Sequence, residues 1–473
     1  MIDRLVFMLL LGVLAIVPLP FASVHPWTWG VLVVVSGVLL LGWSLAVWSG
    51  ASVTARSRPS TAMLTIFVAV FLWTLFQIAP FSPARWHHPL WIEASQALSL
   101  DLPGSIALVP DKAFGAILRF CSYATIFWLS FQYCRDPKRA KTLIFVIAVS
   151  SACYAAYGLI EHFSGTMTIL WYRKTAYWDD LTSTFVNKNN YATYAGLGWL
   201  CTLALLYRSF SLSLEGVKLG SEKLRYAIAY IEKSGWRYIL MVFLLIGALL
   251  YSHSRAGLAA TILGILVFCL ALSVNKSTDK KFIRRFGIGA FILALVLFAA
   301  GGQTMDARLA GTDLSIEERP KVYQRTMTAI GDQPFLGSGL GSFEEIFRFY
   351  RTPDIHEVFD YAHNSYLEGA LELGIPATAL IVGSILVCAA MAGRGARIRR
   401  RDEIYSCLGL AVTTLVGLHS LLDFSIQIPA VAITYSGILG ASLAQSWSSR
   451  TPPAAGMARR SASEDAGQPS NVG

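Results

Sequence analysis

The chain has 473 residues, of which 55% are hydrophobic and 14% are charged, and its mean hydropathy is +0.53. A soluble domain carries roughly 25% charged residues, so this composition excludes an ordinary soluble enzyme and predicts a membrane protein. The net charge of +10 would favour nucleic-acid binding only if the basic residues were gathered on one surface.

Apolar runs long enough to cross the hydrocarbon layer of a bilayer recur along the chain. They fall at 5–24, 27–49, 61–80, 113–133, 142–162, 185–207, 236–253, 256–274, 286–303, 365–392, 404–422 and 427–447. We therefore predict an all-α integral membrane protein of about twelve transmembrane helices, with one long outer loop that contains short helices. The first run contains Pro18 and Pro20, but a second run follows at once, so we interpret it as a retained helix.

The basic residues predict the orientation of these spans. If the N-terminus is cytoplasmic and the chain alternates, the cytoplasmic segments hold about two thirds of the 39 lysine and arginine residues. The positive charge then sets the topology, and we expect no nucleic-acid partner. Two long connections, 81–112 and 304–364, lie on the outer side in this arrangement. A connection as long as the second is usually functional.

The spans and loops suggest a division of the chain into four parts. We expect N-terminal helices in 1–184, a core with the outer loop in 185–392, C-terminal helices in 393–447 and a disordered cytoplasmic tail in 448–473. The seven cysteines lie in or beside apolar runs without paired spacing, which predicts neither a disulfide framework nor a zinc site. No cofactor or metal is expected.

Arg255 lies in YSHSRAGLAA, at the outward turn between the seventh and eighth predicted spans. The loop is almost absent there, so Arg255 is expected at the membrane surface, on the side that usually avoids positive charge. A guanidinium at this depth suits the phosphate oxygens of a lipid head group. Snorkelling or helix capping is the alternative.

The long outer loop contains a second group of cations. Arg319 and Lys321 are expected along a short amphipathic helix begun by Pro320, although they also suit ordinary charge balance with neighbouring glutamates. The stretch GSGLGSF (337–343), with glycine at every second position, predicts a tight turn or a backbone nest.

His363 stands at the entry of the predicted span 365–392. Asn364 follows it directly, and Glu368 and Glu372 come at the helical spacing of four. Carboxylates at the start of an apolar helix are costly, so we expect them to face a polar cavity. A histidine beside carboxylates is suited to removing a proton from a hydroxyl group. The alternative is an interfacial histidine that caps the helix.

Other polar patterns carry weaker signals. HEVFD (356–360) has aspartate where a zinc protease motif needs its second histidine, so a metallohydrolase is not favoured. NKNNYATY (187–194) begins the sixth predicted span and makes Asn187 and Lys188 candidate substrate contacts. HSLLDF (419–424) ends the eleventh span. Helix capping explains these last two clusters as well as a function does.

Three motifs together resemble the O-antigen ligase and polymerase superfamily of bacterial membrane glycosyltransferases. They are YSHSRAG, the pattern from Arg319 to PFLGSGLGSF (334–343), and a histidine signature formed by His363, Asn364 and Gly374. The likeness covers 185–385 in detail. The ligase form of the signature has Gly, Thr or Tyr three residues after the glycine, whereas this chain has Ala377. HSLLDFSIQIPA resembles polysaccharide polymerases, so the branch stays open.

The resemblance implies metal-independent glycan transfer at the outer, periplasmic face of the bacterial inner membrane. The donor would be a polyprenyl-diphosphate-linked glycan such as one on undecaprenol, and the acceptor another glycan or lipid A core. Partners would be membrane lipids and other polysaccharide-assembly proteins. Arg255 and Arg319 would hold the diphosphate and His363 would activate the acceptor. The remaining substrate contacts would be Asn364, Glu368, Lys321, Lys188 and Asn187.

Elementary chemistry agrees with these roles. The charge that develops on a diphosphate leaving group needs fixed cations, and a sugar hydroxyl needs a base. The competing class is a transporter or flippase for a lipid-linked or anionic solute. It is disfavoured by the long outer loop and by the lack of a visible internal repeat.

Overall fold

The computed structural model describes residues 2–50, 58–213, 225–226, 228–275, 289, 314–399 and 402–447. Within these residues, eight helices are long and apolar enough to cross a membrane. They are α2 (Pro26–Trp48), α3 (Arg58–Ile78), α5 (Pro110–Tyr133), α6 (Pro137–Ser164), α7 (Lys188–Ser213), α9 (Trp236–Tyr251, with helical turns from Ile228 before it), α10 (Arg255–Val274) and α15 (Ile375–Ile398).

Three shorter apolar helices pack among the long ones. They are α1 (Ile2–Ile16), α16 (Glu403–His419) and α17 (Pro429–Ala444). The other elements are α4 (Leu90–Leu98), α12 (Leu314–Asp332), α13 (Phe343–Tyr350), α14 (Ser365–Leu373) and a two-stranded antiparallel ribbon of β1 (Thr168–Ile169) and β2 (Tyr172–Arg173). Single turns occur at Phe21–Ser23, Ala84–Trp86, Ile231–Gly235 and Ser425–Gln427.

The all-α membrane class is supported, but the count of about twelve spans is not confirmed. The predicted span 286–303 lies outside the described residues, apart from residue 289. The predicted first span 5–24 is too long, because α1 ends at Ile16 before Pro18 and Pro20. The predicted tail 448–473 is likewise outside the described residues.

The predicted span 365–392 is wrong as one continuous helix. Gly374 separates α14 from α15 with φ +81° and ψ 157°. A Cβ at Gly374 would lie 2.3 Å from the carbonyl oxygen of Phe335, so the close approach of two backbones requires glycine here. The predicted helix start at Pro320 is also wrong, because this proline lies inside α12.

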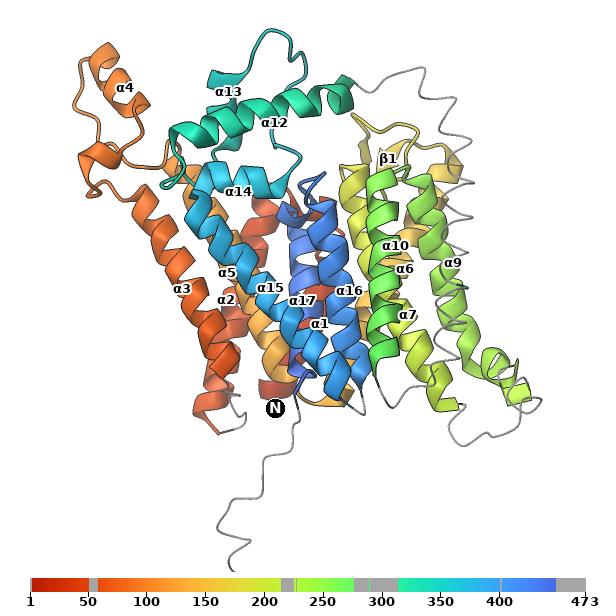
Figure 1. Cartoon of the computed structure of the whole chain (residues 1–473). Helices are drawn as coiled ribbons and strands as arrows, with labels where there is room; N and C mark the ends of the chain where they lie inside the picture. Colours follow the sequence, from red (N-terminus) through yellow and green to blue (C-terminus); the bar gives the residue numbers. More distant parts are fainter. Residues whose placement is uncertain are drawn as a thin grey trace, which may run out of the picture.

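The helices form one bundle, and α12, α13 and α14 lie across one end of it, at the top of Figure 1. We call this the loop end. The N-terminus lies at the opposite end (Figure 1), where Asp3 pairs with Arg139 at 2.6 Å. The end of α17 lies there too, since Gln445 donates a hydrogen bond to the Cys134 carbonyl. Both ends of the described chain therefore lie on the side opposite α12, α13 and α14, and the assignment of that side to the cytoplasm stays a prediction.

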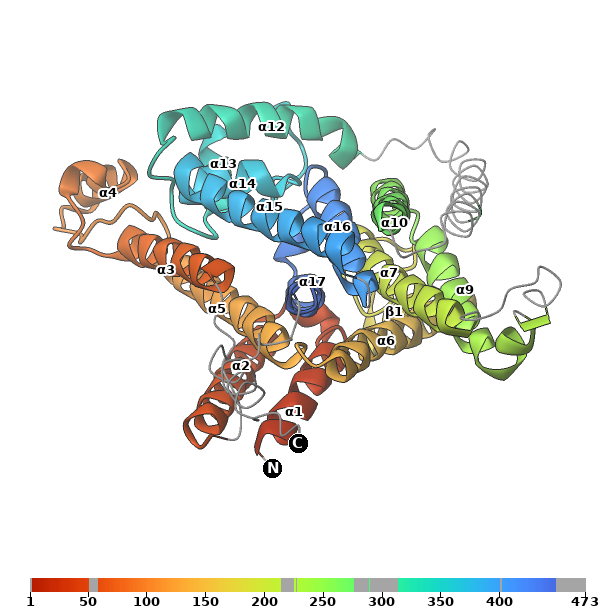
Figure 2. The same ribbon diagram turned by 60° about the horizontal axis from the view of Figure 1, so that its bottom comes forward.

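The core of the bundle surrounds α17. This helix is buried along almost its whole length and packs against α5, α16, α6 and α7, and Figure 2 shows it between its neighbours. Gly440 lets α17 approach α5, because a Cβ there would lie 2.4 Å from the carbonyl oxygen of Phe127. Small residues at such contacts are typical of helix packing in membranes.

A second, smaller core lies at the loop end. It joins α12, α13 and α14 through Val322, Phe343, Phe347, Phe359 and Leu371. The carboxylate of Glu318 adds a polar contact, since it accepts hydrogen bonds from the backbone N–H groups of His356 and Glu357. Residues 314–364 therefore have their own packed structure, and Glu318 holds the segment between α13 and α14 against α12.

Candidate functional site

His363 lies at the loop end, between the small core and the main bundle. It precedes α14 directly, and its backbone has φ +52°, in the left-handed region that side-chain-bearing residues adopt at a cost of about 1–3 kcal/mol. Tyr323 on α12 fixes this conformation by donating a hydrogen bond to the His363 carbonyl at 3.0 Å. A strained residue held by its surroundings at such a place favours a functional side chain.

The imidazole of His363 faces a buried carboxylate. Its Nδ1 lies 3.6 Å from Oδ2 of Asp423, within ion-pair reach but longer than a hydrogen bond. Phe359 and Phe424 contact the ring with centroid distances of 6.1 and 4.9 Å. Nδ1 is buried among these groups, which leaves Nε2 as the nitrogen available to a substrate hydroxyl.

Asp423 is the centre of a polar network. Its carboxylate accepts hydrogen bonds from the Asn189 side chain at 3.0 Å and from Ser425 Oγ at 2.7 Å. Burial opposes ionisation of Asp423, yet the contacts with His363 and Ser425 keep its pKa below the usual range. The group beside His363 is therefore a carboxylate at neutral pH.

The same network reaches α10. Ser254, the N-cap of α10, donates a hydrogen bond through Oγ to Asn189 Oδ1 at 2.8 Å. Arg255 is the next residue and the first of the helix, with an exposed side chain. The part of the chain that the structure describes offers its guanidinium no hydrogen bond or ion pair. Helices α7 and α10 both begin here, and their N-termini add partial positive charge.

Arg319 approaches the network from α12. Its guanidinium donates a hydrogen bond to the carbonyl of Leu422, the neighbour of Asp423, at 3.0 Å. Its Nε is buried without a partner among the described residues. Arg319 and His363 thus meet the same short segment, 422–424, from two sides. The structure brings together Arg255, Arg319 and His363 at one end of the bundle through this network.

Two other predicted substrate contacts, Asn364 and Lys321, already have partners within the protein. Asn364 is the N-cap of α14 and accepts hydrogen bonds from Tyr366 and Leu367 N–H at 3.1 Å each. Lys321 pairs with Asp354 at 3.1 Å on the surface. Their substrate contacts remain predictions. The alternative expectation for this helix, a cap formed by His363, is wrong, because Asn364 is the N-cap.

Asn187 and Lys188 lie at the start of α7, on the α10 side of the network. Lys188 pairs with Asp180 at 2.9 Å, and the other oxygen of Asp180 lies 2.7 Å from Nδ1 of His253. Asn187 donates a hydrogen bond to the hydroxyl of Tyr177 at 3.0 Å. These contacts hold the start of α7 and the residues just before Arg255 in place. Asn187 and Lys188 therefore have a structural role here, and their contact with substrate stays a prediction.

The glycine-rich stretch GSGLGSF is a backbone nest, as one of the two expectations had it. Gly337, Gly339 and Gly341 all have positive φ. The stretch contacts the end of α14, because the N–H groups of Ser338 and Gly339 donate hydrogen bonds to the carbonyls of Leu371 and Glu372. The group that the nest holds is the carboxyl of Glu372, whose Oε1 accepts a hydrogen bond from Phe343 N–H at 3.1 Å. This arrangement accounts for the glycine spacing without a phosphate.

Glu368 and Glu372 are buried on α14. Oε2 of Glu368 accepts a hydrogen bond from Ala362 N–H at 2.9 Å, which fixes the residue before His363. Burial, with Glu372 nearby, raises the pKa of Glu368 well above its usual range. Burial raises the pKa of Glu372 to about 7, against the hydrogen bonds from Gly341 and Phe343. Both carboxyls thus hold protons more strongly than exposed glutamates do.

Sequence reasoning did not single out three residues of this region: Asp423, Asn189 and Arg119. Asp423 and Asn189 lie in the polar clusters HSLLDF and NKNNYATY, which helix capping explained as well as a function did. The signal that could have found them is that one cluster ends a span and the other begins a span on the same side of the membrane. Arg119 lies inside the span α5, where a charge is costly and indicates function.

A family model described as O-antigen ligase matches residues 240–382. This segment contains Arg255, Arg319, His363 and Gly374, while Asn189 and Asp423 lie outside it. No curated protein matches the chain. The match supports the O-antigen ligase and polymerase superfamily and suggests a glycan ligase or polymerase of the glycosyltransferase type.

Proposed function

We propose that this chain transfers a glycan from a polyprenyl diphosphate to an acceptor hydroxyl. The match of residues 240–382 to the O-antigen ligase family model supports this reaction. The reaction takes place at the loop end, which we propose faces the periplasm from the inner membrane. The acceptor is a growing glycan or lipid A core. The observation that carries the proposal is the network Ser254–Asn189–Asp423–His363.

The two arginines bind the diphosphate of the donor. Arg255 lies at the start of α10 with its guanidinium free of described partners, and Arg319 reaches the same network from α12. A guanidinium fork matches phosphate oxygens, and the N-termini of α7 and α10 add to the positive potential. As the bond from the anomeric carbon to the diphosphate oxygen breaks, the charge left on that oxygen is stabilised by these fixed donors.

His363 is the general base. Nε2 accepts the proton of the acceptor hydroxyl while that oxygen forms its bond to the anomeric carbon. The carboxylate of Asp423, 3.6 Å from Nδ1, stabilises the imidazolium that results. A buried carboxylate beside the remote nitrogen of a catalytic histidine also fixes its orientation. The proton leaves His363 to solvent after the product departs, and the lipid diphosphate is released.

The direct test is transfer by purified protein in detergent. A polyprenyl-diphosphate-linked oligosaccharide is supplied with lipid A core or with a second lipid-linked oligosaccharide. We expect product in one of the two reactions, and release of the polyprenyl diphosphate in equal amount. A protein that moves the donor across vesicle membranes but transfers no sugar to either acceptor would contradict the proposal in favour of a transporter.

A further inference from the structure

A cavity of about 920 Å³ lies beside the segment that holds His363, and neither Arg255 nor Arg319 lines it. It is lined by parts of α2, α3, α5, α14, α15 and α17, whereas Arg255 and Arg319 belong to α10 and α12. The volume is at the upper end of the roughly 300–1,000 Å³ of ligand pockets. The proposed mechanism does not use this cavity, although its wall reaches the base.

The wall between the cavity and His363 is thin. Tyr361 and Ser365, the residues that flank His363 at a distance of two, both line the cavity. Tyr361 stacks on Phe424 with centroids 4.1 Å apart, and Ser365 Oγ donates a hydrogen bond to the Asp423 carbonyl at 3.2 Å. A ligand in the cavity would therefore place its polar end beside the catalytic histidine.

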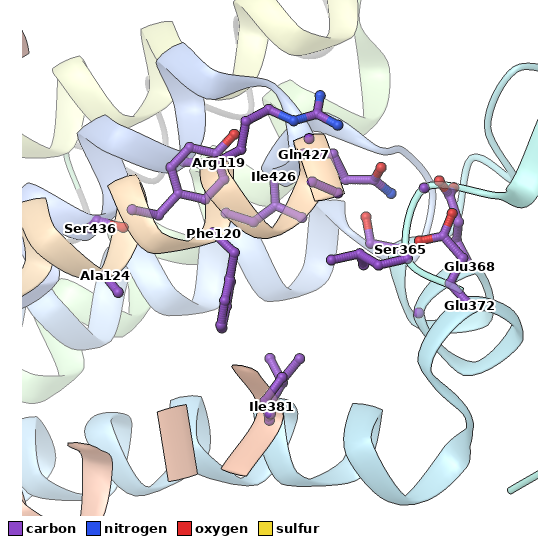
Figure 3. A pocket seen from close by; sticks show the side chains of 18 of the residues that line it. Arg119, Phe120, Ala124, Ser365, Glu368, Glu372, Ile381, Ile426, Gln427 and Ser436 are labelled. Atoms are coloured by element: carbon purple, nitrogen blue, oxygen red, sulfur yellow. The ribbon is translucent and has the colours of Figure 1, made fainter. Parts of the chain in front are cut away.

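The cavity is amphipathic. Most of its lining is apolar, with Phe67, Phe120, Ile381 and Leu439 among the side chains that face it. Its polar end holds Arg119, Gln427, Ser365, Glu368 and Glu372, and Figure 3 shows them grouped away from Ile381. Such a division suits a molecule with a hydrocarbon chain and a polar head.

Arg119 is the strongest sign of a ligand. It lies nine residues into α5, roughly 13 Å along the axis from the start of that helix. Within the described residues, its guanidinium lies 5.4 Å from the ring of Trp29 and interacts electrostatically with Glu372, but it donates no hydrogen bond. A charge inside a span normally faces a partner or a polar path, because leaving it unpaired costs free energy.

The polar end also contains many acceptors. The carboxyl groups of Asp360, Glu368 and Glu372 and the amide of Gln427 line it. Carboxyl groups that donate and accept hydrogen bonds, together with an amide and one arginine, suit a head rich in hydroxyl groups. A diphosphate is matched better where more than one guanidinium group is available. The diphosphate is better placed at Arg255 and Arg319, so the chemistry assigns the cavity to the other substrate.

We propose that this cavity binds a glycolipid acceptor, with its hydrocarbon chains against the apolar wall and its sugar head at Arg119, Glu368 and Gln427. This inference rests on the proposed function, because it assigns the second substrate of the same transfer. It narrows the acceptor to a glycan that carries its own lipid anchor. The head then reaches His363 past Tyr361 and Ser365.

Two photoreactive probes test the assignment without any need for transfer. One is a diacyl glycolipid with a diazirine in an acyl chain, and the other is a polyprenyl diphosphate with a diazirine in its chain. We expect the glycolipid to label cavity residues on α5 and α15, and the prenyl probe to label elsewhere. Labelling of these residues by the prenyl probe alone would overturn the acceptor assignment.

A matched pair of variants on α15 makes the test specific. Ile381→Trp fills the cavity, whereas the adjacent Leu380→Trp adds the same bulk at a side chain that is 47% exposed. We expect Ile381→Trp to lower glycolipid labelling at least about tenfold and to raise the KM for acceptor but not for donor. Leu380→Trp should match the wild type. Equal labelling in both variants would overturn the proposal.

Arg119→Gln gives a second test that does not depend on steric fit. Loss of the charge should weaken glycolipid labelling by about tenfold or more, since charged hydrogen bonds are stronger than neutral ones. Should Ile381→Trp fail to elute as folded protein, Ser384→Trp, one turn further on the same wall, takes its place. Wild-type protein that binds the glycolipid here but transfers no sugar would contradict the proposed function and leave the lipid site standing.

Discussion

His363 Nδ1 and Asp423 Oδ2 lie 3.6 Å apart although sixty residues separate them in the chain. The carboxylate is buried and held by Asn189 and Ser425, so it cannot turn away from the imidazole. This pairing leaves Nε2 as the reactive nitrogen and supplies a negative charge where a proton arrives. The contact is longer than a hydrogen bond, and catalytic contacts often shorten when the substrate binds.

Asp423→Asn should therefore lower kcat strongly while the KM for the donor stays near its wild-type value. The amide keeps the shape and most hydrogen bonds but loses the charge that stabilises the imidazolium. We expect a loss of about 10²–10⁴-fold, the usual range for an impaired base. Steady-state kinetics with both substrates varied measures the split. An equal rise in the donor KM with unchanged kcat would show that Asp423 serves binding instead.

His363→Ala should still bind the lipid-linked donor but transfer about 10²–10⁴-fold more slowly. His363→Gln should do no better, because an amide cannot take up the proton. Donor binding is measured separately by equilibrium titration of purified protein in detergent.

His356 is the matched control for that experiment. Its side chain is 71% exposed and contacts Glu318, which keeps two backbone hydrogen bonds when the imidazole is removed. His356→Ala should keep activity, and EDTA should leave the wild type active. Activity that is lost with EDTA and lost equally in both alanine variants would contradict a metal-independent base at His363.

The sequence was enough to name His363 and the two arginines as candidates, because their motifs are local. It could not reveal Asp423 as the partner of His363, since that contact forms only when α16 and α14 pack at the loop end. Asn189 was hidden for the same reason, as its two partners come from segments 65 and 234 residues away. From the sequence alone, a polar residue that caps a helix cannot be distinguished from one that joins a buried polar network, because only tertiary contacts differ between them.

The long apolar helices were predictable from hydropathy, and α2, α5 and α10 lie close to their expected positions. The break at Gly374 was not predictable, because α14 contains enough apolar residues to resemble the first turns of α15. Its buried face packs on the small core of the outer loop, which a hydropathy pattern cannot distinguish from a membrane. The role of the glycines in GSGLGSF likewise depends on the end of α14 that they wrap.

The buried glutamates predict a pH dependence of stability. The pKa of Glu372 is about 7 in the folded protein, above the 4.5 of an exposed glutamate, so the folded state binds the extra proton. Stability is then highest at low pH within this window and falls as pH rises from about 4.5 to 7. Thermal unfolding in detergent should show the melting temperature decreasing over that range.

Replacing both carboxyls removes this dependence. The Glu368→Gln/Glu372→Gln double variant should show a flatter melting temperature between pH 5 and pH 8, while Glu93→Gln, an exposed position on α4, should behave as the wild type. Identical pH slopes in the double variant and the wild type would mean that neither glutamate holds its proton in the folded state.

The orientation in the membrane is open to chemical labelling. Val358 is 70% exposed at the loop end, and Arg394 is exposed near the far end of α15. In a variant without the seven native cysteines, an impermeant thiol reagent applied from the periplasm should label Val358→Cys and not Arg394→Cys. The reverse pattern would place the proposed base and both arginines in the cytoplasm and remove the basis for periplasmic transfer.

The final prediction concerns the two arginines. Arg255→Ala and Arg319→Ala should each raise the activation free energy by about 2.7–4 kcal/mol, the cost of removing a donor that stabilises developing charge. Arg→Lys keeps the charge but loses the bidentate fork, so it should restore part of the rate. Arg348→Ala is the control, because this arginine is 65% exposed and forms a surface ion pair with Glu344, worth at most about 1 kcal/mol. Initial rates at matched protein amounts, with product identified by mass, measure the effects. Wild-type rates in either alanine variant would remove that arginine from the diphosphate site, while losses of similar size in all three variants would point to general destabilisation of the outer loop.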